Sequence, residues 1–228
     1  MTEEIEAPPV GAGQASEPAQ HPRHPRRAHR TRDPAALGLH EYAQAVAEVC
    51  PYMLPSQRGG QTWWTRLRPP AASHRAIESL VFASGVTAAE RVRARRAAGD
   101  TLACEVLAID TAQPSTVVNL PHLALKHLYA TVGITVGCFA PDRQHELTSG
   151  KLIPAAPTVV LALRTAVPRR DAQLLGHMPS SALHIARGSD DGREVLSAVP
   201  SLAAGADPIS AWRKVRPWIR AQRCDEEV

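Results

Sequence analysis

Hydrophobic residues recur along the central part of the chain with two different periods. Between residues 37 and 50 they return every three or four positions, which predicts a helix that Pro51 and Pro55 should end. Shorter apolar runs bounded by turn residues predict strands, and these runs lie at residues 61–67, 101–109, 134–139 and 158–167. Helical segments separate the runs. The alternation predicts an α+β or α/β fold, with a single sheet of about four to five strands and helices packed on it.

Capping residues indicate where other helices begin and end. Ser73 is expected to cap a helix over residues 74–83, and a capping box at residues 87–90 is expected to open a separate helix. Pro217 should kink or break the last helix, because proline removes a backbone donor. The remaining helices are expected to start near Asn119, Arg169 and Asp207. These signals place helices between and after the predicted strands.

Composition sets the first 34 residues apart from the rest of the chain. Residues 1–34 are rich in Pro, Arg and Ala with almost no large apolar side chains, so we expect a disordered tail there. Residues 35–228 are expected to form a single α+β domain, since a hydrophobic fraction of 44% supports a core. The net charge of +4 is scattered and no nucleic-acid-binding module is recognisable, which argues against a nucleic-acid partner. Four arginines spread around one predicted helix are expected to form a solvated surface: Arg91, Arg93, Arg95 and Arg96.

Cysteine usage and hydropathy narrow the class of protein further. The four cysteines are far apart, without a CxxC pair or a Cys/His cluster of zinc spacing, so we predict reduced thiols and no metal site. No apolar run reaches membrane-spanning length. These features predict a cytoplasmic protein without a transmembrane helix.

One histidine falls in apolar surroundings on its predicted helix. His127 shares a side with leucines and Ala124, while His122, Lys126 and Tyr129 are expected on the opposite side. A histidine in that position either ligates a metal or haem iron or is a hydrogen-bonded core residue.

Two further residues stand out, although the common catalytic signatures GxSxG and GxGxxG are absent. Arg164 lies inside the run TVVLALRTAV, where a guanidinium needs an anionic partner or open water. Cys138 alternates with Ile134 and Val136, so we expect it to pack in the core. A reactive thiol would need a helix N-terminus or a cationic neighbour.

The stretch CPYMLPSQRGGQTWW, residues 50–64, combines a Cys-Pro pair, a turn-rich passage and two adjacent tryptophans. If its end is a strand, Trp63 and Trp64 point to opposite faces of the sheet, so only one of them can line a pocket. We expect the stretch to frame one wall of a pocket, with Cys50 near the end of the preceding helix.

The run GITVGCFAPDRQHELTSGKLIPAAPTVVLALRTAVPRRDAQLL, residues 133–175, resembles an actinobacterial family of unknown function whose members are often encoded near biosynthetic genes. That family has a GLMxGxFHP strand end, a loop, and a PVPxLAIRxMV strand. The stretch from residue 50 is similar to the family's CPFV segment and its following GTLW strand, so the resemblance covers about residues 40–177. Arg164 matches the arginine of the AIR motif, which implies that it contacts a partner group.

A more distant similarity is to the YqcI/YcgG family, some of whose members are haem-dependent N-hydroxylases acting on guanidine or amine groups. Both families carry His-Pro in a turn where this chain has Phe139, Ala140 and Pro141. The resemblance implies that the role of that histidine passes to His127 or His145, or that the activity is altered or lost.

Two functions are therefore expected. The first is a natural-product tailoring enzyme that binds haem and performs oxidative chemistry. In it, residues 50–64 and 137–145 would converge with Arg164 on a pocket, a tryptophan would form one wall, and Arg164 would pair an acidic group. The second is a non-catalytic module that binds a metabolite or a partner protein. The missing turn histidine and the absence of a recognisable nucleophile–base pair favour this second reading.

Overall fold

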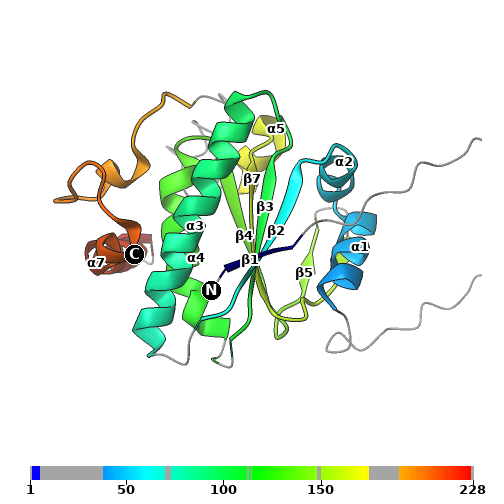
Figure 1. Ribbon diagram of the computed structural model, residues 1–228, viewed down its shortest axis with the longest axis horizontal. Helices are drawn as coiled ribbons and strands as arrows, with labels where there is room; N and C mark the ends of the chain where they lie inside the picture. Colours follow the sequence, from blue (N-terminus) through cyan, green and yellow to red (C-terminus); the bar gives the residue numbers. More distant parts are fainter. Residues whose placement is uncertain are drawn as a thin grey trace, which may run out of the picture.

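The computed structural model describes residues 2–5, 38–69, 73–111, 113, 115–147, 150–174 and 190–226. At 2–5, 172–174 and 223–226 it describes the backbone only. One five-stranded sheet runs through the molecule, and helices cover both of its faces (Figure 1). The predicted α+β fold with a single main sheet is therefore confirmed. Within the described residues, no helix is long and apolar enough to cross a membrane.

The main sheet mixes parallel and antiparallel pairs. Its spatial order is β1 (Thr2–Ile5), β2 (Thr62–Leu67), β3 (Cys104–Ile109), β7 (Val159–Thr165) and β4 (Ile134–Phe139). Strands β2 and β3 are parallel, so the chain must cross over between them, and the helix α3 (His74–Ala97) makes that connection. The other neighbours pair antiparallel. A second, small sheet pairs β5 (His145–Glu146) with β6 (Leu152–Ile153).

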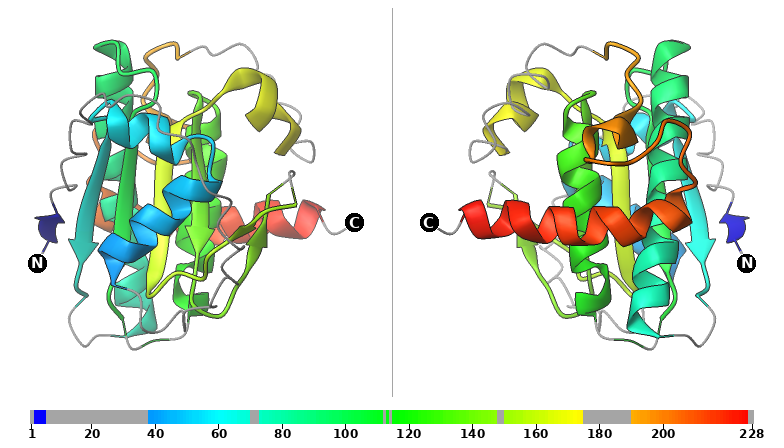
Figure 2. Two further views of the ribbon diagram at one scale, coloured as in Figure 1. Left: turned by 90° about the vertical axis from the view of Figure 1, so that its right-hand side faces the viewer. Right: turned by 90° about the vertical axis from the view of Figure 1, so that its left-hand side faces the viewer.

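The two faces of the sheet are covered by different helices. On the α3 face lie α3, α4 (Asn119–Ala130) and α7 (Pro208–Glu226), which crosses the outside of the other two (Figure 2). On the α1 face lie α1 (Leu39–Val49) and α2 (Met53–Arg58) (Figure 1). Strand residues alternate between the two cores, so Leu161 and Leu163 face α3 while Val160 faces α1. The remaining elements are α5 (Pro168–Leu174) and two 3-10 turns, η2 (Ser115–Val118) and η3 (Val195–Ala198).

Three helix boundaries differ from those predicted. Helix α3 is continuous, so the predicted capping box at residues 87–90 is wrong, and the Thr87 hydroxyl donates instead to the Ala83 carbonyl within the helix. Helix packing explains the continuity, because Gly85 lies so close to Leu125 that a Cβ there would clash with it. Pro55 does not end α1 but lies in the first turn of α2, where its missing N–H costs little. Pro217 lies inside α7 without breaking it.

The first residues differ from the predicted disordered tail. Thr2–Ile5 forms β1, which pairs antiparallel with β2 so that Thr2 lies opposite Leu67 and Ile5 opposite Trp64. Pairing of this kind uses backbone groups alone, so a segment with few apolar side chains can still close an exposed strand edge. Residues 6–37 lie outside the described part of the chain.

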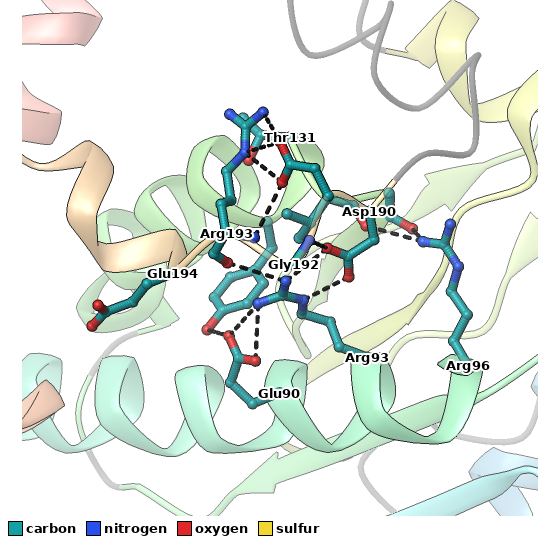
Figure 3. Close-up of polar contacts among 12 residues, drawn as sticks. Glu90, Arg93, Arg96, Thr131, Asp190, Gly192, Arg193 and Glu194 are labelled. Atoms are coloured by element: carbon teal, nitrogen blue, oxygen red, sulfur yellow. Dashed lines mark hydrogen bonds and ion pairs between the residues drawn. The ribbon is translucent and has the colours of Figure 1, made fainter. Parts of the chain in front are cut away.

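A polar network ties residues 190–194 to the outside of α3 and α4 (Figure 3). The Arg93 guanidinium donates to both carboxylate oxygens of Asp190, at 2.8 and 2.7 Å, and to Glu90. The Tyr129 hydroxyl also donates to Glu90, at 3.0 Å. Since Arg93 is only 11% exposed and bonded to both Glu90 and Asp190, this network fastens residues 190–194 to α3.

Candidate functional site

The two adjacent tryptophans point to opposite faces of the sheet, as predicted. Trp64 is buried in the α1-face core, where it joins Tyr42 and Cys104. Trp63 packs against the α3-face core, and the Arg95 guanidinium stacks over its ring at 3.1 Å from the centroid. The pair therefore cannot form one continuous wall.

Arg164 has the anionic partner that its position required, and the partner belongs to the same chain. Its guanidinium donates to both oxygens of Asp171 at 2.7 and 2.8 Å, and Asp171 is fully buried. The guanidinium also stacks on the Tyr52 ring, 4.0 Å from the centroid. The Val167 backbone N–H completes the coordination of Asp171. Arg164 thus clamps α5 to the start of α2, and its charge is already matched.

The two candidate thiols lie on different faces. Cys138 packs in the α3-face core as predicted, and burial raises the pKa of its thiol to about 11, so it is not a thiolate at neutral pH. Cys50 is partly buried against the α1-face core, at the end of α1.

Both histidines of α4, His122 and His127, are partly buried. The sequence placed Tyr129 on the polar side of this helix with His122, and for Tyr129 this is wrong, because it is fully buried. The His122 Nε2 lies 3.1 Å from the Val136 carbonyl of the edge strand β4, and burial lowers the pKa of His122 to about 4.

His145 lies on the other side of the sheet from α4. Its ring packs edge-on against Phe139, with centroids 5.1 Å apart, and Phe139 belongs to the α1-face core. The Nε2 atom of His145 is buried and has no hydrogen-bond partner among the described residues.

The residues expected to hold haem are divided between the two faces of the sheet. Of the two alternative histidines, His127 is on α4 on the α3 face, whereas His145 is on the α1 face together with Trp64. The guanidinium of Arg164 is already held by Asp171. Within the described ranges, no group of three or more His, Cys, Asp or Glu residues is arranged to hold a metal ion. Haem binding stays a prediction from the resemblance.

A different set of polar residues meets on the α3 face, at a groove of about 250 Å³ between α3 and the strands β2 and β3. We call it the α3 groove, and its lining consists of Thr65, Leu67, Ser84, Thr87, Arg91 and Leu107. The fold creates it because Ser84, Thr87 and Arg91 follow one another at helical spacing and Thr65 and Leu67 alternate on β2. Three hydroxyls and one guanidinium thus face two leucines.

A buried carboxylate adjoins this groove. Glu105 on β3 is 3% exposed, accepts from the Thr65 hydroxyl at 3.2 Å, and forms an ion pair with Arg91. Burial raises the pKa of Glu105, while the nearby cations Arg91 and Arg95 and the Thr65 bond oppose that rise. Both hydrogen bonds that Glu105 receives from described residues end on Oε1, so Oε2 keeps its acceptor capacity.

Two features of the sequence conceal this site. The run LACEVLAI has the pattern of one apolar strand, which hides its single carboxylate. The helix arginines have the spacing of a solvated surface, yet Arg91 pairs with Glu105 and Arg95 covers Trp63. The available signal was a charged residue in the middle of a buried strand, since such residues are almost always paired.

Comparison with known proteins does not assign the chain to a family. No protein-family model matches it, and neither a curated protein nor a solved structure is significantly similar to it. The resemblances described from the sequence therefore stay predictions, and the function has to be argued from the geometry of the α3 groove.

Proposed function

We propose that this protein binds a small polar molecule in the α3 groove. The observation that carries the proposal is a groove lined by three hydroxyls and a partly exposed guanidinium, with a buried carboxylate bonded to two of the lining residues, Thr65 and Arg91. Ligand sites combine an apolar lining with a few polar groups, and a carboxylate whose pKa is shifted by burial is typical of such sites.

The size of the groove limits its ligand. Pockets for drug-sized molecules have volumes of about 300–1,000 Å³, and the α3 groove has about 250 Å³. The ligand is therefore a small metabolite. This corresponds to the metabolite-binding module that was the second of the two functions expected from the sequence. The oxidative, haem-dependent alternative has less support, because the Arg164 guanidinium that would pair an acidic group is already held by Asp171.

The test uses a substitution that fills the groove and leaves Arg91 and Glu105 unchanged. Ser84→Leu places a leucine in the groove from α3, whereas Ala94→Leu adds the same side chain at an exposed position of the same helix. Saturation-transfer NMR against a mixture of acetate, propionate, lactate and their amides measures binding. We expect signals with the wild type and Ala94→Leu and a loss of signal with Ser84→Leu.

Two outcomes would contradict the proposal: equal signals from all three proteins, or none from the wild type. Thr87→Leu blocks the groove from an exposed position one turn further along α3 and serves as a second filling variant if Ser84→Leu does not fold. Cooperative urea unfolding of each variant shows that it is folded.

A further inference from the structure

The charges beside the α3 groove are unequally exposed. The Arg91 side chain is 46% exposed, and its partner Glu105 is 4% exposed. Arg91, which lines the groove, thus pairs with a carboxylate that is almost inaccessible to solvent. Because a guanidinium has five N–H donors and the pair uses the Arg91 Nη2 atom, donors remain for a second acceptor.

The surroundings of Glu105 carry an excess of positive charge. Arg91 and Arg95 face it from α3, Thr65 and Trp63 flank it on β2, and its register partner on β7 is the apolar Leu163. Two cations therefore act on one carboxylate. A site with this balance attracts an anion of charge −1.

We propose that the α3 groove takes a small monocarboxylate, whose carboxylate group binds Arg91 while Glu105 takes up a proton from solvent. The inference rests on the proposed function, since it names the class of ligand for the same groove. The exchange balances: one carboxylate anion and one proton enter, and the site gains no net charge.

The proton goes to Glu105 for a physical reason. The Arg95 guanidinium is held over the Trp63 ring, so the bound carboxylate and Glu105 have only the Arg91 guanidinium to share. Two carboxylates that share one guanidinium in a partly desolvated site repel each other, so one of them is protonated. The Glu105 side chain is only 4% exposed and burial already raises its pKa, whereas a ligand that binds the 46% exposed Arg91 keeps contact with water. A protonated Glu105 can also donate a hydrogen bond to the bound carboxylate.

Calorimetry tests the proton uptake. Propionate is titrated into the protein near neutral pH in two buffers that differ in ionisation enthalpy, and propionamide is titrated in parallel. With the wild type we expect uptake of up to one proton per propionate and an affinity that falls as pH rises, by up to tenfold per unit. Glu105→Gln carries a permanently neutral group, so we expect no proton uptake, no pH dependence and tighter binding than the wild type at alkaline pH.

A pair of arginine variants tests the carboxylate preference. Arg91→Met should lose the preference for propionate over propionamide. Arg75→Met removes an exposed arginine near the start of the same helix, and this variant should still prefer propionate over propionamide. Because Arg91→Met leaves Glu105 without its ion pair, Arg91→Lys, which keeps the charge, serves as a second variant and should bind propionate with reduced affinity.

The outcomes separate this inference from the proposed function. Propionate binding without proton uptake, or with equal uptake in Glu105→Gln, overturns the inference. Binding of propionamide but not propionate overturns the carboxylate class and leaves small-molecule binding intact. If the wild type binds neither probe and gives no signal with the wider mixture, both proposals fail.

Discussion

Two buried carboxylates are paired with arginines on opposite faces of the same sheet, and the pairs differ in how completely they are satisfied. Asp171 is fully buried, and both of its oxygens accept from the bidentate Arg164 while a backbone N–H adds a third bond. Glu105 is nearly as buried, but its bonds end on one oxygen, and its arginine is half in water beside a groove.

The difference indicates which pair supports structure and which is available for function. A fully buried carboxylate with both oxygens bonded is not accessible to a ligand, and its removal leaves a buried cation behind. A carboxylate with a free oxygen beside a groove can exchange partners or protons. The resemblance drew attention to Arg164, yet the saturated geometry there is that of a clamp between α5 and α2.

The largest expected effect comes from breaking the saturated pair. Asp171→Ala leaves Arg164 without its counter-charge at a site where it is 19% exposed, so we expect a loss of about 3–5 kcal/mol in the free energy of unfolding. Urea denaturation measures it. The control is Asp110→Ala, which removes the partner of Arg66 at the surface and should cost less than about 1 kcal/mol. Equal costs would contradict the distinction between the two sites.

His122 also makes stability depend on pH, so its effect has to be removed before the effect of Glu105 can be measured. His122 has a pKa of about 4 in the fold and 6.5 as its ordinary value, so between these values the unfolded chain binds more protons. Stability should therefore fall on acidification from pH 6.5 towards 4, by up to about 1.4 kcal/mol per pH unit.

His122→Gln should remove that acid sensitivity, because glutamine keeps a donor for the Val136 carbonyl and does not titrate. Denaturation midpoints between pH 4 and 7 follow the effect. His127→Gln, at a partly buried position of the same helix, is the matched control. An unchanged pH profile in His122→Gln would show that the burial of His122 does not control it.

The smallest expected effect comes from Glu105→Gln in the His122→Gln background. The amide oxygen can still accept from Thr65 and Arg91, so the change in stability should be on the order of 1 kcal/mol. Its sign depends on pH. The folded pKa of Glu105 is raised above its ordinary 4.5, so its stabilising contribution is complete below pH 4.5 and is lost as pH rises through the folded pKa.

The stability of the Glu105→Gln variant relative to its His122→Gln parent should therefore increase with pH. Urea denaturation at several pH values measures this difference in the free energy of unfolding. A parallel Asp171→Asn variant should be less stable than its parent throughout, because an amide cannot hold both guanidinium N–H groups and the Val167 N–H together. If stability depended on pH in the same way in both variants, the proposed difference between the Glu105 and Asp171 pairs would be wrong.

Much of the fold was readable from the sequence because its signals are local. The run at residues 134–139 became β4 with the predicted bounds, and Ser73 caps α3 through a bond from the Ala76 N–H at 3.3 Å. Alternation correctly placed Trp63 and Trp64 on opposite faces. The errors arose where packing decides, as at Gly85, whose contact with Leu125 keeps α3 continuous through a predicted break.

By itself, the sequence determined four strands of the main sheet, most of the helices and the α+β class, because apolar periodicity and caps act over a few residues. Only the tertiary structure decided what the charged side chains meet. Thr65 and Glu105 are 40 residues apart, and Arg91 is 14 residues from Glu105. They come together because the crossover helix α3 brings β2 and β3 into parallel register. Such pairings depend on the position of whole elements, and no local pattern encodes them.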